Sequence, residues 1–122
     1  MPAALFERVE RICSALPETT LRTDRWAHAF MIRRRNFAFL MAPEDPAGVP
    51  RPMLIFHADP LERRALLHQG HPFFGTRSGN RVGVVLDDDT DWVEVTELVT
   101  ESYRMLAPQK LVKLLDPPVG SD

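Results

Sequence analysis

The chain has 122 residues, of which 44% are hydrophobic and 26% charged, and its formal net charge is −2 at pH 7. A chain of this length buries roughly two-thirds of its unfolded surface, so one core without disulfides or a structural metal is expected. The slightly acidic balance excludes a strongly basic, nucleic-acid-coating domain, and no apolar run approaches the ~18 residues of a membrane span.

The first predicted element is an amphipathic helix that ends near Ala15. Apolar residues between Leu5 and Leu16 are spaced by one, three and four positions, which places them on one helical face. Pro17 cannot continue the helix, because it lacks the N–H donor and its ring clashes with the preceding turn. The helix is therefore expected to face the core.

A β-hairpin is predicted next, because the residues from Arg25 to Ile32 alternate with period two. The polar segment Arg33–Asn36 is short enough to reverse the chain, and Phe37–Met41 alternates again. A loop follows over residues 43–52, which hold four prolines and a glycine. The apolar segment Met53–Ala58 is the third predicted strand.

The sequence Asp59-Pro60-Leu61-Glu62 predicts the start of a second helix. The aspartate can accept from exposed backbone N–H groups, the proline suits the first helical position, and the glutamate completes a capping box. Gly70 is a natural end for this helix. A loop is predicted over residues 71–80, and the alternation in Val82–Leu86 predicts a fourth strand.

Another capping box, Asp91 with Glu94, predicts a helix that runs to Leu106. Pro108 begins a short final helix, and residues 116–122 are expected to form a frayed tail.

The predicted order is α-β-β-β-α-β-α-α, in one domain over residues 1–115. Sequential strands followed by segregated helices are typical of an α+β domain with a mainly antiparallel sheet. The sheet is expected to have four strands, with the helices packed on one face. The small residues Ala27, Ala29 and Ala38 would let a helix pack closely on that sheet.

Several short stretches keep an order and spacing found in a known family. They are Leu16-Pro17-Glu18, Arg35-Asn36-Phe37-Ala38-Phe39-Leu40, Ala58-Asp59-Pro60, Glu101-Ser102-Tyr103-Arg104 and Ala107-Pro108-Gln109-Lys110-Leu111. Together they resemble the MmcQ/YjbR family of small bacterial proteins over nearly the whole chain. The resemblance implies the fold of bacterial frataxin (CyaY). It also implies DNA as a partner, because such proteins are often labelled DNA-binding by analogy with a double-wing domain.

The chain departs from these relatives at two positions and lacks the features of an iron carrier. His57 and Val82 stand where the family commonly has Lys and Trp. In the first helix, Glu7 and Glu10 are interleaved with arginines, so the clustered carboxylates of a frataxin-like iron ridge are missing. Iron delivery is not expected.

The candidate nucleic-acid contacts centre on three arginines at the predicted hairpin tip. Guanidinium groups bind phosphate oxygens in pairs, and a β-ribbon can enter a groove or straddle a backbone. The alternative is a solvated turn, since no aromatic residue interleaves these arginines and no helix-turn-helix or zinc-finger pattern occurs. The predicted nucleic-acid-binding residues are Arg33, Arg34, Arg35, Arg77, Arg81 and Lys110.

The charge is unevenly distributed along the chain. Residues 1–85 hold 12 Lys+Arg and 8 Asp+Glu, a balance of +4, and residues 86–122 hold 3 and 9, a balance of −6. Either one surface of the folded protein is locally basic, or its solvated faces differ by chance. Asp87, Asp88 and Asp89 with Asp91 do not have EF-hand spacing, so helix capping is favoured over a cation site.

No catalytic residue, metal ligand or cofactor is predicted. His28, His57, His68 and His71 lie in no metal-ligand pattern, and Cys13 falls on the apolar stripe of the first helix. A nucleophile elbow, a phosphate loop and a dinucleotide fingerprint are missing. The single cysteine and the charged amino-terminal residues, unlike those of a signal peptide, predict a cytoplasmic protein.

The predicted function is weak DNA binding by a non-enzymatic, monomeric domain through the basic hairpin. The alternative is a protein-interaction or small-ligand-binding module that uses the sheet face and the His71–Phe74 loop. In that loop, two aromatic rings either cap the core or line a pocket with Trp26. A deep cavity with converging histidines would favour a ligand, whereas a flat sheet with clustered arginines would favour nucleic acid or a protein partner.

Overall fold

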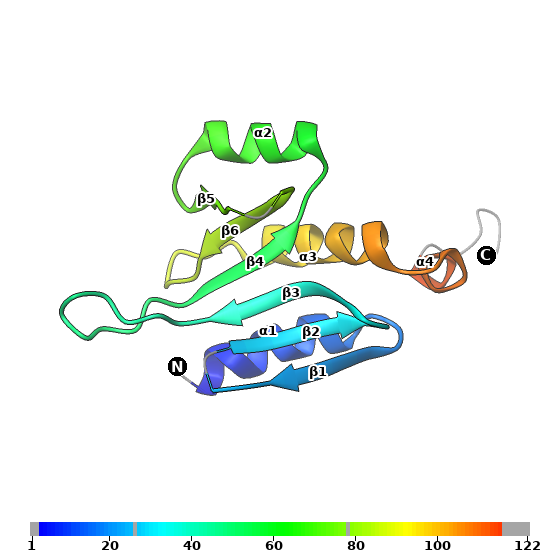
Figure 1. Ribbon diagram of the computed structural model, residues 1–122, viewed down its shortest axis with the longest axis horizontal. Coiled ribbons are helices and arrows are strands. Elements are labelled where there is room, and N and C mark those ends of the chain that lie inside the picture. The colour runs from blue at the N-terminus through cyan, green and yellow to red at the C-terminus, as the bar shows by residue number, and fades with distance from the viewer. Residues whose placement is uncertain (1–2, 26, 78, 116–122) are drawn as a thin grey trace.

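The computed structural model describes residues 3–25, 27–77 and 79–115, and Figure 1 shows the arrangement of its elements. Within these ranges the helices are α1 (Ala3–Ser14), α2 (Pro60–Gln69), α3 (Trp92–Leu106) and α4 (Gln109–Leu115). The strands are β1 (Thr19–Thr23), β2 (Ala27–Ile32), β3 (Arg35–Met41), β4 (Met53–His57), β5 (Phe73–Gly75) and β6 (Arg81–Val85). Trp26 and the predicted tail, 116–122, lie outside the described residues.

The strands form one antiparallel, six-stranded sheet in the order β1-β2-β3-β4-β6-β5. The predicted α+β class and antiparallel sheet are confirmed, but the predicted four strands and their order are wrong. The two missed strands are the outer ones. Four of the five residues of β1 are exposed, so it lacks an apolar alternation, and β5 has only three residues, within the predicted loop over residues 71–80.

The reversal between β2 and β3 is tighter than predicted. Only Arg33 and Arg34 form the turn, because Arg35 and Asn36 already belong to β3. Arg33 has a left-handed backbone (φ 58°), and so does Glu18 in the preceding turn (φ 56°). The side chains of these two residues form an exposed ion pair, with Arg33 Nε 3.2 Å from a Glu18 carboxylate oxygen.

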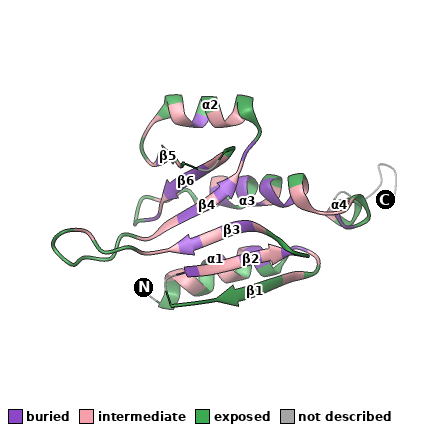
Figure 2. Cartoon of the chain, viewed as in Figure 1, coloured by how far each residue is buried: buried purple, intermediate pink, exposed green. Residues whose placement is uncertain are grey.

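The hydrophobic core lies between one face of the sheet and the helices. Ala38, Phe56 and Val82 are cross-strand partners in adjacent strands, and all three are buried. Their cluster includes side chains from every described helix, among them Val9 of α1 and Leu66 of α2. Figure 2 shows burial concentrated on β3, β4, β6 and α3, while β1 is exposed. The helices therefore pack on one face, as predicted.

The predicted helix starts are confirmed by their hydrogen bonds. Asp59 accepts from the N–H groups of residues 61 and 62 at the start of α2, at 2.9 and 3.0 Å. Asp91 accepts from the N–H groups of residues 93 and 94 at the start of α3, both at 3.1 Å. Each carboxylate lies at the positive end of its helix dipole, so the capping role predicted for Asp91 is borne out.

The loop between β3 and β4 projects from the sheet and is held by its own hydrogen bonds (Figure 1). Asp45 accepts from the backbone N–H groups of Ala47 and Val49 at 2.8 and 3.0 Å, and its carboxylate pairs with Arg51 at 2.8 Å. These contacts lower the pKa of Asp45, that from Val49 most strongly. The predicted loop over residues 43–52 is thus an ordered projection.

Candidate binding face of the sheet

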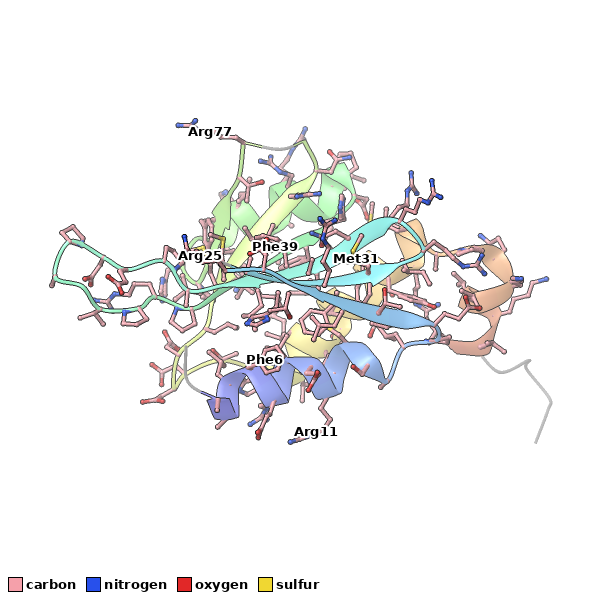
Figure 3. All side chains as sticks on the ribbon, turned by 60° about the horizontal axis from the view of Figure 1, so that its bottom comes forward. Phe6, Arg11, Arg25, Met31, Phe39 and Arg77 are labelled. Atoms are coloured by element: carbon pink, nitrogen blue, oxygen red, sulfur yellow. The ribbon has the colours of Figure 1, made fainter. Side chains whose placement is uncertain are left out.

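The face of the sheet opposite the core is covered by none of the described helices, and we call it the open face. Figure 3 shows Met31 and Phe39 on this side of the sheet and Phe6 of α1 on the other. A row of successive cross-strand partners crosses it from β1 to β5. The row consists of Arg22, Ala29, Phe39, Ile55, Gly83 and Phe74.

The centre of the open face is apolar. The solvated face of an antiparallel sheet is ordinarily polar, but Phe39 and Ile55 lie at the middle of this one. The flanking row is apolar too, and it consists of Ala27, Met41, Met53 and Val85. Apart from buried Ala27 and Gly83, the side chains of these two rows keep part of their surface exposed. An apolar patch rimmed by polar groups is typical of an interaction surface.

Phe73 and Phe74 point to opposite sides of the sheet. Phe73 is 5% exposed and belongs to the core cluster, so the predicted core-capping role is confirmed for this ring. The ring of Phe74 lies over Gly83 on the open face. A Cβ atom at Gly83 would lie 2.1 Å from Cζ of Phe74, so the ring occupies the space that any other residue would fill.

One end of the open face is basic. His57 and Arg81 are cross-strand partners at the end of β4 and the start of β6. Burial lowers the pKa of His57, and the positive charges of Arg81 and Arg35 lower it further, while a hydrogen bond with the backbone of Asn36 opposes them. Arg81 thus lies beside His57 on the open face, and the charge of Arg35, whose register partner is the core residue Ile32, also acts on this histidine.

The other predicted contacts do not join this group. Arg33 is partly neutralised by Glu18, and Arg34 is exposed beside it in the turn. Lys110 lies exposed on α4. Figure 3 shows Arg77 projecting away from the sheet. A single stripe of all six predicted residues is not formed.

Sequence reasoning missed Arg22, which lies on the open face beside Ala29. Arg22 was missed because its strand, β1, was missed. The segment around Thr20 and Arg22 contains too few apolar residues to show the alternation that predicts a strand. Open-face positions in the six strands carry no acidic residue. Their charged members are arginines.

Ser102 of α3 forms hydrogen bonds with two strands at the basic end of the sheet. Its hydroxyl donates to the Phe37 carbonyl at 2.6 Å and accepts from the backbone N–H of His57 at 2.9 Å. Phe37 is the extra residue of a β-bulge, because Phe30 and Met31 pair with residues 38 and 36. The serine thus joins β3 to β4 where the regular ladder is interrupted.

The histidines proposed as alternative site residues do not converge. The ring of His28 packs on Phe6 at 4.4 Å, on the core side, whereas His57 lies on the open face. His71 lies at the opposite end of β4 and β6 from His57, in a cleft of about 200 Å³ that also includes Asp87 and Asp91. No group of three or more His, Cys, Asp or Glu in the described ranges is placed to hold a metal ion.

Cys13 lies in the core, where burial raises its pKa to about 12. Its predicted place on the core stripe of the first helix is confirmed. Among residues 3–25, 27–77 and 79–115, no helix is both long and apolar enough to cross a membrane.

Comparison with protein-family models gives a match over most of the chain. The model of a family described as YjbR matches residues 14–105, which include every strand and most of α3. The matched range contains the open face, its arginines and Ser102. The curated proteins that were searched contain no match.

Proposed function

The chain belongs to the YjbR family, and from this membership and the charge of the open face we propose that it binds nucleic acid weakly. The binding is non-enzymatic and uses phosphate contacts at the basic end of the sheet. Arg35 and Arg81 make the main contacts, and Arg22 makes a further one across the face. Arg33, Arg34, Arg77 and Lys110 are peripheral to this site.

The observation that carries the proposal is the charge of the open face in a protein whose net charge is −2. The charged residues at its strand positions, Arg22 and Arg81, are both basic, whereas Asp87, Asp88, Asp89 and Asp91 lie in the segment between β6 and α3. A polyanion is attracted to the basic side and repelled by acidic groups elsewhere. The lowered pKa of His57 is consistent with a positive field there.

The number of arginines sets the expected salt dependence of nucleic-acid binding. Each neutralised phosphate of a single strand contributes about −0.7 to the slope of log K against log salt concentration. The three guanidinium groups therefore predict a slope of about −2, which corresponds to weak, strongly salt-dependent binding.

Fluorescence anisotropy with a labelled oligonucleotide tests the proposal. The affinity is measured at salt concentrations from about 50 to about 200 mM, where phosphate binding depends steeply on salt. The double variant Arg35→Gln/Arg81→Gln should bind at least ~10-fold more weakly and with a shallower salt slope. The matched control Arg11→Gln/Arg64→Gln removes two exposed charges from helices and should change the affinity less than ~2-fold. Figure 3 places Arg11 on the helical side.

Two results would contradict the proposal. One is a wild-type protein that shows no salt-dependent binding to any oligonucleotide. The other is an equal loss of affinity in the two double variants, which would mean that binding follows net charge and has no site on the open face.

A further inference from the structure

The apolar centre of the open face is not explained by phosphate binding. Phosphate contacts need the arginines, yet Phe39 lies at the middle of the open face and the Phe74 ring covers Gly83 of β6. Exposing aromatic rings to water is unfavourable, so a ligand that covers them gains free energy. The ligand must therefore present both negative charge and flat apolar surface.

The two rings are placed to present separate surfaces. Phe39 on β3 and the glycine beneath Phe74, Gly83 on β6, are separated by Ile55 on β4. Neighbouring strands are about 4.8 Å apart, so the two backbone positions lie roughly 10 Å from each other. That distance is too large for direct stacking of one ring on the other. Each ring, and Ile55 between them, is available to a different group of the ligand.

The absence of a side chain at Gly83 brings the Phe74 ring down onto the sheet. The distal ring atoms Cε1, Cε2 and Cζ would lie within 2.7 Å of a Cβ at this position. The distal edge of the ring thereby lies over the Gly83 backbone, and the residue remains partly exposed. An aromatic side chain held in this way has little conformational freedom left to lose when a ligand covers it.

Unpaired bases match this surface better than a duplex does. Bases of a single strand expose their faces and stack on aromatic side chains, while their phosphates follow a basic groove or rim. A duplex hides those faces and is read by an element that enters a groove. The obvious candidate, the β2–β3 turn, is only two residues long, and its Arg33 is paired with Glu18.

We propose that the open face is a platform for single-stranded nucleic acid, on which Phe39 and Phe74 stack with unpaired bases and Arg22, Arg35 and Arg81 hold separate phosphates of the same strand. This inference rests on the proposed nucleic-acid function and specifies its ligand. The charge complementarity of the arginine rim favours this occupant over a protein partner, for which the apolar rows alone would suffice.

The test compares three probes of equal length: oligothymidine, an abasic strand with the same phosphates, and a duplex. At low salt the wild-type protein should bind oligothymidine at least ~10-fold more tightly than the abasic strand, because base stacking is present only in the first. It should also prefer oligothymidine to the duplex. Equal affinity for oligothymidine and the abasic strand would overturn the platform.

The double variant Phe39→Leu/Phe74→Leu keeps apolar side chains but removes the aromatic rings. It should lose at least ~10-fold in affinity for oligothymidine and less than ~2-fold for the abasic strand. The matched control Met41→Leu/Met53→Leu alters the neighbouring row of the same face and should bind both probes like the wild type. An equal loss on both probes in the phenylalanine variant would show that the rings only shape the surface.

A measurement on the unaltered protein covers the case in which a variant fails to fold. Ile55 lies between the two aromatic positions, so bases stacked there should shift its methyl resonance upfield, and the abasic strand should not. An unshifted resonance at saturation would contradict the platform. If abasic strands still bind with a salt slope that Arg35→Gln/Arg81→Gln reduces, the proposed function survives without the platform. If no probe binds, both proposals are wrong.

Discussion

The side chain of Ser102 forms hydrogen bonds with two neighbouring strands, β3 and β4. It is fully buried, and its hydroxyl serves the carbonyl of the bulged residue Phe37 and the N–H of His57 at the same time. A buried backbone group that loses its partner costs far more than the net value of the bond itself. The serine therefore contributes to stability through the two backbone groups that it satisfies.

Ser102→Ala should lower the free energy of unfolding by about 2–3 kcal/mol, because it leaves both backbone groups without their partner. Urea denaturation measures the change. Thr100→Ala is the matched control on the same helix, since the Thr100 hydroxyl donates at an exposed site to the Thr96 carbonyl, and its effect should stay within about 0.5 kcal/mol. Similar values for the two variants would refute the bridging role.

His57 reports the electrostatic field at the basic end. Its pKa lies below the ordinary 6.5, first because of burial and then because of Arg81. The unfolded chain therefore takes up the proton first as the pH falls. The contribution of His57 to stability is full above pH 6.5 and decreases as the pH drops below it.

Arg81→Gln should raise the pKa of His57 toward 6.5, because one of the nearby positive charges is removed. Nuclear magnetic resonance titration of the imidazole C–H signal measures it. Arg11→Gln, on the helical side of the molecule, should leave that pKa unchanged. If Arg81→Gln leaves the pKa of His57 unchanged, the charge of Arg81 does not contribute to lowering it.

At the scale of elements, the two outer strands of the sheet differ in how they are held. β1 is mostly exposed, whereas the three-residue β5 is anchored by one ring in the core and another over Gly83. A glycine in a strand interior weakens pairing, and an aromatic ring on the neighbouring strand compensates by covering it. Phe74 and Gly83 should therefore be energetically coupled.

Gly83→Ala should destabilise the protein by about 1 kcal/mol, because the new Cβ displaces the Phe74 ring and removes this cross-strand packing. Phe74→Leu should then cost less in the Gly83→Ala background than in the wild type. A double-mutant cycle from urea denaturation gives the coupling. Strictly additive effects would show that the ring and the glycine do not depend on each other.

The sequence predicted the elements whose signals are local. The capping residues Asp59 and Asp91 mark two helix starts, period-two alternation marks β2, β3 and β6, and a short apolar segment marks β4. β1 and β5 gave no such signal, because an exposed edge strand needs no apolar side and three residues show no period. The two outer strands of the sheet therefore could not be predicted from the periodicity of the sequence.

The candidate site was predicted only in part for the same reason. Charge alone predicts Arg35 and Arg81, but their nearness to His57 depends on the pairing of β4 with β3 and with β6. His57 and Arg81 are 24 residues apart along the chain. Arg22 required knowledge of β1. Phe39 and Phe74 were seen as a strand residue and a loop residue, and only the sheet order places them on one surface.

At the scale of the whole molecule, a helical layer covers one side of the sheet and leaves the other side to solvent or a partner. The central strands share the core with α3, whereas β1 contributes no residue to the buried cluster. Regions with few buried apolar contacts open most readily in the native state. The molecule should thus be most stable at its centre and least stable at the β1 edge.

Hydrogen exchange followed by mass spectrometry or nuclear magnetic resonance tests this gradient. Amides of β3, β4 and α3 should exchange most slowly, with protection that approaches global unfolding, and those on the outer side of β1 should exchange fastest among the strands. Saturating oligothymidine should add protection on the sheet and little on α1. Uniform protection across all six strands would contradict the gradient.

The projecting loop between β3 and β4 has a practical consequence for labelling. It leaves the sheet at the end opposite Arg35 and His57, and Ala47 at its tip is exposed while its backbone is held by Asp45. The native thiol, Cys13, is buried and almost wholly protonated at neutral pH. A maleimide dye would therefore attach to Ala47→Cys alone, giving a site-specific reporter remote from the arginines without removal of the natural cysteine.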